Sequence, residues 1–138
     1  MGARTKSRKR ALDILFESEQ RGINAVTLLE ERVAVPVTQA PVNDYTQTLV
    51  RGVVDHWGVI NEAIATYSRD WPMDRMPAVD RALLRVAVWE LVFGPEDVPE
   101  SAAIAEAVGL ARELSTDESP RFVNGLLGRI AEVKTTLV

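Results

Sequence analysis

The first ten residues carry five basic side chains and no acidic one: Arg4, Lys6, Arg8, Lys9 and Arg10. The whole chain has a net charge of −4, so this cationic segment precedes an anionic body. Lysine and arginine bind phosphates through ion pairs, and arginine can also donate two parallel hydrogen bonds. Such an asymmetry is typical of proteins that bind a polyanion, although short basic N-termini are also common where they are merely solvated. Composition alone leaves both interpretations open.

Residues that could support catalysis are scarce. The chain has a single histidine, His56, and no cysteine. No serine or carboxylate is placed by sequence to pair with His56, so we interpret it as a helix residue near the core. The sequence also lacks clustered metal ligands, a P-loop and a GxGxxG motif. These features predict a protein that is not an enzyme and needs no metal or cofactor.

Length and composition indicate one globular unit. With 138 residues, of which 46% are hydrophobic, the chain can form one substantial core. The N-terminus has no apolar signal segment, and no apolar run is long enough to cross a bilayer. The lack of cysteine suits a reducing compartment. We therefore expect a single domain over residues 1–138, with residues 1–10 as a mobile basic arm, in the cytoplasm and with no membrane contact.

The segment Pro77 to Phe93 must organise the other elements, because its apolar residues cover nearly the whole circumference of a helix. Such a helix belongs in the centre of a fold. Only four charged residues interrupt it: Asp80, Arg81, Arg85 and Glu90. Buried charges are normally paired, so we expect Arg85 and Glu90 each to bind a neighbouring helix, with Glu106 as the acceptor for Arg85.

The other apolar patterns also recur every three or four residues and predict an all-α fold of seven helices. Gly22 is the predicted end of the first helix, Asn24 a predicted cap, Gly58 a predicted break between two helices, and Ser119 the predicted N-cap of the last helix. Gly125 is expected to let a neighbouring helix approach closely. Besides 77–93, the predicted helices are 8–21, 25–35, two within 44–71, 99–115 and one from 119 to 133.

A series of motifs resembles the NusB family of transcription antitermination factors. The specific part is Ile104-Ala105-Glu106-Ala107-Val108 followed by Phe122-Val123-Asn124-Gly125-Leu126-Leu127. Ala78 to Arg85, Trp89-Glu90-Leu91 and Val98-Pro99 precede these motifs in the family's order, and Lys9-Arg10-Ala11 with Ile14-Leu15-Phe16 is similar to its arginine-rich first helix. The resemblance covers nearly the whole chain.

The resemblance implies two three-helix bundles with an N-terminal arm or extra helix, and no enzymatic activity. It also implies binding to the boxA element of ribosomal RNA leaders, in a heterodimer with NusE, which is also a small-subunit ribosomal protein. Such complexes help RNA polymerase read through terminators. Some members self-associate and occlude the RNA surface, so a homodimer is a further expectation.

The resemblance also implies site residues. Arg4, Lys6, Arg8, Lys9 and Arg10 would bind phosphates, while Arg121 and Phe122 at the start of the last helix would hold and stack a base. Phe122 could instead be a core aromatic. Asp80 would contact NusE, or it could simply stabilise the positive end of its helix. Ala105 and Pro120-Arg121 depart from the residues that are usual in the family.

Two other functions remain open at this stage. The chain could be a helical scaffold that binds only proteins, with an incidental basic arm. It could also resemble the NusB-like domain of certain ribosomal RNA methyltransferases, although it lacks their catalytic cysteine and a following cofactor-binding domain.

Overall fold

The structure is a computed structural model that describes residues 2–37, 40–69 and 71–138. These residues form seven α-helices and one short 3-10 helix, and they contain no strand. The predicted seven-helix, all-α fold is therefore confirmed. The helices are α1 (Ala3–Arg21), α2 (Ala25–Ala34), α3 (Asp44–Asp55), α4 (Trp57–Tyr67), α5 (Ala78–Phe93), α6 (Glu100–Leu114), α7 (Ser119–Val133) and the 3-10 helix η1 (Lys134–Thr136).

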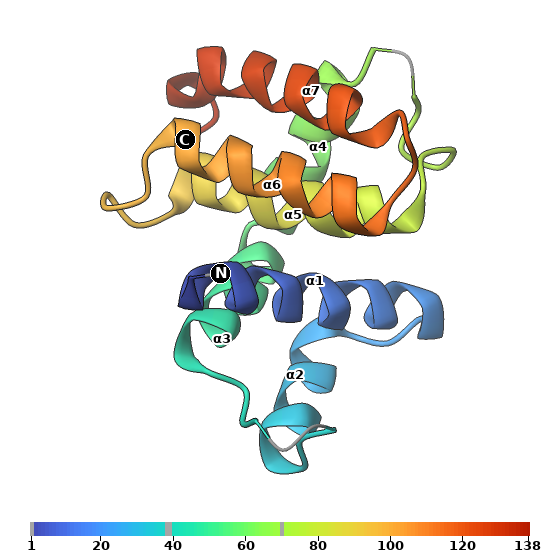
Figure 1. The fold of residues 1–138 in the computed structure, drawn as a ribbon, viewed down its shortest axis with the longest axis vertical. Coiled ribbons are helices and arrows are strands. Elements are labelled where there is room, and N and C mark those ends of the chain that lie inside the picture. Colours follow the sequence, from blue (N-terminus) through green and yellow to red (C-terminus); the bar gives the residue numbers. More distant parts are fainter. Residues whose placement is uncertain (1, 38–39, 70) are drawn as a thin grey trace.

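The helices form two groups, with α1 to α3 in the lower half of Figure 1 and α4 to α7 in the upper half. The N-terminal group has three helices, and the second has four. Helix α5 belongs to the second group and also packs on the first, so it contacts α1, α3, α4, α6 and α7. Eleven of its residues are buried, as expected for a helix that is apolar nearly all round. The predicted central helix is confirmed.

Local signals at α1 and α2 act as predicted. Gly22 ends α1 in the left-handed conformation (φ 66°), which a residue without a Cβ adopts at no steric cost. The side chain of Asn24 then accepts hydrogen bonds from the backbone N–H groups of Val26 and Thr27, and so caps α2. The sharp corner between these helices is therefore encoded within three residues.

The basic N-terminal segment forms the start of a helix that packs on the fold, rather than a separate arm. Helix α1 begins at Ala3 rather than Arg8, so all five basic residues belong to its first two turns. Ser7 is buried there and donates a hydrogen bond to Asn43, while the hydroxyl of Thr46 donates to the carbonyl of Ser7. These contacts with α3 and its N-cap residue hold the start of α1 in place. No local sequence pattern predicted them.

Two glycine predictions are also corrected. The break between α3 and α4 falls at His56, whose ring stacks on Phe93 at 3.7 Å, and Gly58 lies inside α4. Close approach occurs at Gly52 of α3, where a Cβ would overlap the indole of Trp89 on α5. At Gly125 a Cβ would meet only the tip of the Arg129 side chain, so no neighbouring helix requires that glycine.

Candidate nucleic-acid interface

Three of the predicted phosphate ligands share the outward side of α1. Lys6, Lys9 and Arg10 are three and four residues apart and so lie on one helix face. Lys6 is exposed and makes no ion pair among the described residues. Lys9 donates to Glu113 of α6 at 2.8 Å, which raises the pKa of the lysine. Arg10 donates to the carbonyl oxygen of Ala40. A cationic face is therefore open to a ligand.

Arg4 lies on another side of the helix and is also partly accessible. Its guanidinium forms an ion pair with Asp97 at 3.2 Å and lies 4.6 Å from the centre of the Tyr45 ring. Both partners of the ion pair are exposed, so water screens their attraction and a competing phosphate can replace the carboxylate. Arg4 can therefore extend the cationic face.

Arg8 is not available to a ligand, contrary to prediction. Its side chain is 7% exposed, its Nε donates to Glu90 of α5 at 2.8 Å, and Glu106 of α6 lies 3.6 Å away. Tyr45 donates to the other oxygen of Glu90 at 2.5 Å. Burial and this hydrogen bond raise the pKa of Tyr45, so its hydroxyl remains a donor. Arg8 holds α1 against the rest of the fold.

Arg85 has a different partner from the predicted one. It binds Glu19 of α1 at 2.9 Å and Asn61 of α4 at 2.9 Å, and it stacks on Trp57. Arg81 also donates to Glu19, and these hydrogen bonds hold the pKa of that carboxyl below its usual range. The expected acceptor, Glu106, instead binds Arg8 and accepts a hydrogen bond from Thr5. The prediction that Arg85 pairs with a residue of a neighbouring helix is therefore confirmed, but the partner is Glu19 and not Glu106.

The start of α7 presents the other predicted RNA ligands. Arg121 is exposed, and Phe122 is half-buried, with its ring edge-on to Trp71 at a centroid distance of 4.9 Å. Phe122 thus packs against the core with part of its ring and leaves part accessible. Neither of the two alternatives considered from sequence describes it fully.

Asp80 is fully buried, so it offers no surface for a direct contact with a partner. Its two carboxylate oxygens accept hydrogen bonds from Ser115 at 2.6 Å and from Ser119 at 2.8 Å. Ser119 therefore binds Asp80 rather than capping α7, which is a correction to its predicted role. These bonds tie the corner between α6 and α7 to the first turn of α5.

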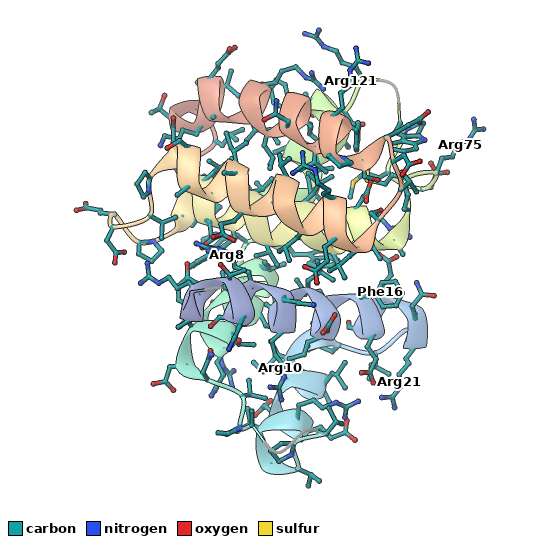
Figure 2. All side chains as sticks on the ribbon, viewed as in Figure 1. Arg8, Arg10, Phe16, Arg21, Arg75 and Arg121 are labelled. Carbon is teal, nitrogen blue, oxygen red and sulfur yellow. The ribbon has the colours of Figure 1, made fainter. Side chains whose placement is uncertain are left out.

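The predicted ligands do not form one cluster. Figure 2 shows Arg8 between α1 and the second helix group, and Arg10 on the opposite side of α1. Arg121 lies at the edge of the second group that is farthest from α1. Helices α5 and α6 separate the two regions in this view. The basic segment of α1 and the tip of α7 are therefore two surfaces rather than a single one.

Sequence reasoning missed two features of these surfaces. Tyr45 and Trp71 contact predicted ligands, but they appeared in the sequence only as members of an apolar helical stripe.

The described ranges contain no group of three acidic or histidine residues that could hold a metal ion. Within the same ranges, no helix has both the length and the apolar character to cross a membrane.

Comparisons with known proteins agree with the resemblance found in the sequence. The model of the NusB family matches residues 5–132. The transcription antitermination protein NusB of Kineococcus radiotolerans is 55% identical over 99% of this chain and 98% of its own length. A structure of T. maritima NusB has a TM-score of 0.81 at 32% identity, covering 95% of this chain and 92% of that one. A crystal structure of antitermination factors NusB and NusE in complex with dsRNA has a TM-score of 0.80 at 27% identity, covering 94% and 96%.

Proposed function

The chain belongs to the NusB family, and on this premise we propose that it binds the boxA element of ribosomal RNA leaders together with NusE. Membership makes the chain a non-catalytic antitermination factor. The proposal places the complex with RNA polymerase in the cytoplasm. It also includes a homodimer that occludes the RNA surface when RNA is absent.

The observation that carries the proposal is the cationic face of α1. Lys6, Lys9 and Arg10 lie on one side of a helix whose first turns are fixed by buried contacts. Because the backbone that carries these cations is already ordered, only their side chains lose conformational entropy when they bind phosphates. Because a structural relative is a complex of NusB and NusE with dsRNA, both RNA and NusE are supported as partners.

The α7 tip supplies the second contact in this proposal. Single-stranded RNA is usually bound by stacking of splayed bases on aromatic rings while cations hold its backbone. Phe122 would stack a base and Arg121 would hold a phosphate, with the strand extending between α7 and α1. Arg8 and Asp80 are buried, and we assign them no direct contact with RNA or NusE.

The test is the salt dependence of RNA binding after Lys6→Gln and Arg10→Gln are combined. Removing one cation that neutralises a phosphate of a single strand lowers the slope of log affinity against log salt by about 0.7. We expect the double variant to bind a boxA strand more weakly and with a slope that is smaller by about 1.4, since two such cations are removed. Arg21→Gln is the matched control, because Arg21 is an exposed arginine at the other end of the same helix.

A protein-only scaffold is the competing function, and one observation favours it. Arg4, Arg8 and Lys9 already face carboxylates of the same chain, which neutralise part of the basic segment. Titration of boxA RNA with NusE present and absent, together with the molecular mass in solution, distinguishes the two functions. A slope that stays the same in the double variant, or no RNA binding under either condition, contradicts the proposal.

A further inference from the structure

An open pocket of about 870 Å³ lies beside Phe122, between α7 and the segment that precedes α5. Phe122, Gly125 and Arg129 line it from positions i, i+3 and i+7 of α7, so they form one stripe along that helix. Gly125 is the middle member. Because it has no side chain, the Arg129 guanidinium can extend over it, and the Arg129 Nη1 lies 3.3 Å from where a Cβ of residue 125 would be.

The walls of the pocket combine flat apolar surface with hydrogen-bond donors. Trp71 meets Phe122 edge-on with an interplanar angle of 87°, so the two rings form a corner rather than a stack. The Nε of Arg129 donates to the carbonyl oxygen of Tyr67 at 2.9 Å, which fixes the side chain. No other partner of its guanidinium is found in the part of the chain that the structure describes, so its terminal N–H groups remain to donate elsewhere.

The mouth of the pocket carries both signs of charge. Arg121 lines it together with the carboxylates of Asp117 and Glu118, and all three side chains are exposed. Two carboxylates at the mouth would repel a phosphate, because like charges repel, so a phosphate alone is not the ligand that this pocket fits. A neutral planar group with donors on one edge and acceptors on another satisfies both signs. Unpaired nucleobases have this chemistry.

Guanine matches this arrangement better than adenine. Its N7 and O6 accept two hydrogen bonds from an arginine, and its N1–H and N2–H₂ can donate to a carboxylate. Adenine has an unprotonated N1 that a carboxylate repels. A purine also covers more aromatic surface than a pyrimidine, and stacking contributes to the affinity of each base.

We infer that the pocket around Gly125 binds one unpaired guanine of a single-stranded RNA, with Trp71 and Phe122 as its apolar walls and Arg129 as a donor. This inference rests on the proposed RNA binding and adds a base-specific site to it. Trp71 and Arg129 then determine specificity, whereas the cations of α1 bind any sequence.

The decisive variant is Gly125→Leu, which fills the pocket from its floor. A Cβ at this position would meet only the Arg129 Nη1, at 3.3 Å, so leucine occupies the space over residue 125 and displaces that donor. Leucine also has a higher helix propensity than glycine, so the fold should not be weakened. Gly128→Leu is the matched control, since Gly128 lies in the same helix, has no neighbour within 4 Å of its Cβ position, and does not line the pocket.

The experiment crosses these variants with changes in the RNA, with NusE present and absent. Each guanine of a boxA strand is replaced in turn by adenine or by inosine, which lacks the N2 amino group. At one position we expect wild-type protein and Gly128→Leu to lose about tenfold in affinity on replacement by adenine, and less with inosine. Gly125→Leu should bind the original strand about tenfold more weakly and no longer distinguish the bases, because the two changes remove the same interaction.

Equal discrimination by Gly125→Leu and wild type overturns the inference, and so does an absence of discrimination at every position in wild type. In both cases the proposed function stands if the Lys6 and Arg10 substitutions still lower the salt slope. No binding by wild type in either condition contradicts both proposals together. Circular dichroism and thermal unfolding of each variant verify that the fold is retained.

Discussion

The two ends of α5 hold the two candidate RNA surfaces in different ways. Near its C-terminal end, Glu90 is 4% exposed and binds the guanidinium of Arg8 and the hydroxyl of Tyr45, which fixes the start of α1. In its first turn, Asp80 is fully buried and accepts hydrogen bonds from Ser115 and Ser119, which fixes the start of α7. Asp80 forms no ion pair with any residue that the structure describes.

This difference shows that a buried carboxylate can be stabilised by a full countercharge or by neutral donors and a helix dipole. The Glu90 site depends on both members of an ion pair. At the Asp80 site, each serine loses only one hydrogen bond when the carboxylate is removed. The two sites should therefore differ in their sensitivity to substitution.

Glu90→Leu should have the largest effect, because it leaves the Arg8 guanidinium buried without its main countercharge. We expect a loss of about 3–5 kcal/mol in the free energy of unfolding, measured by urea denaturation. Adding Arg8→Met to this variant should recover most of the loss, since an apolar pair of similar volume is often as stable as a buried ion pair. If the double variant is no more stable than Glu90→Leu, the ion pair is not the reason for the loss.

Asp80→Ala should have a smaller effect, about 1–3 kcal/mol, because it removes the acceptor for two hydroxyl groups. Asp80→Asn retains one acceptor oxygen and should lose less. Urea denaturation measures the total loss in the free energy of unfolding. Hydrogen exchange shows which part of the fold is affected: protection of backbone amides should fall at the α6–α7 corner and remain unchanged at the start of α1. An equal loss of protection at both places would show that the two ends of α5 are not independent.

Glu19 provides a half-exposed carboxylate for comparison with the two buried ones. Hydrogen bonds from Arg81 lower the pKa of Glu19 in the folded state. The contribution of Glu19 to stability is therefore fully present above its unfolded-state pKa of about 4.3, and it is lost as the pH falls through the folded-state pKa. Wild type should therefore exceed Glu19→Gln in stability at pH 7, and the difference should shrink between about pH 5 and pH 3. A difference that is constant over this range contradicts the assignment. This effect should be the smallest of the three, since the Glu19 side chain is 29% exposed and glutamine keeps a hydrogen-bond acceptor for Arg81 and Arg85.

The fold was predictable where the signal is local or periodic. Apolar residues around the whole of 78–93 indicated the central helix, and Asn24 and Gly22 indicated the corner between α1 and α2 through their own chemistry. Partners of buried charges were not predictable in the same way. Arg85 could have met any of several carboxylates, and the choice of Glu19 over Glu106 depends on which helices become neighbours.

The candidate site was predictable in residue type but not in accessibility. Sequence could group five basic residues within two turns. It could not show that Arg8 is buried against α5, while Lys6 is exposed and Arg10 lies on the opposite side of α1. Exposure depends on the packing of distant segments, which periodicity over eight residues cannot establish. The same limit applies to Asp80, whose buried position depends on two serines 35 and 39 residues further along the chain.

The close approach of Gly52 to Trp89 sets the spacing of the two helix groups. Any side chain at position 52 would have to push α3 away from the indole ring on α5. Tyr45 lies on the same helix as Gly52, so that shift would also draw its hydroxyl away from Glu90. A single methyl group between α3 and α5, at a residue to which we assign no contact with a transcript, would thereby weaken the contacts that hold the first turns of α1.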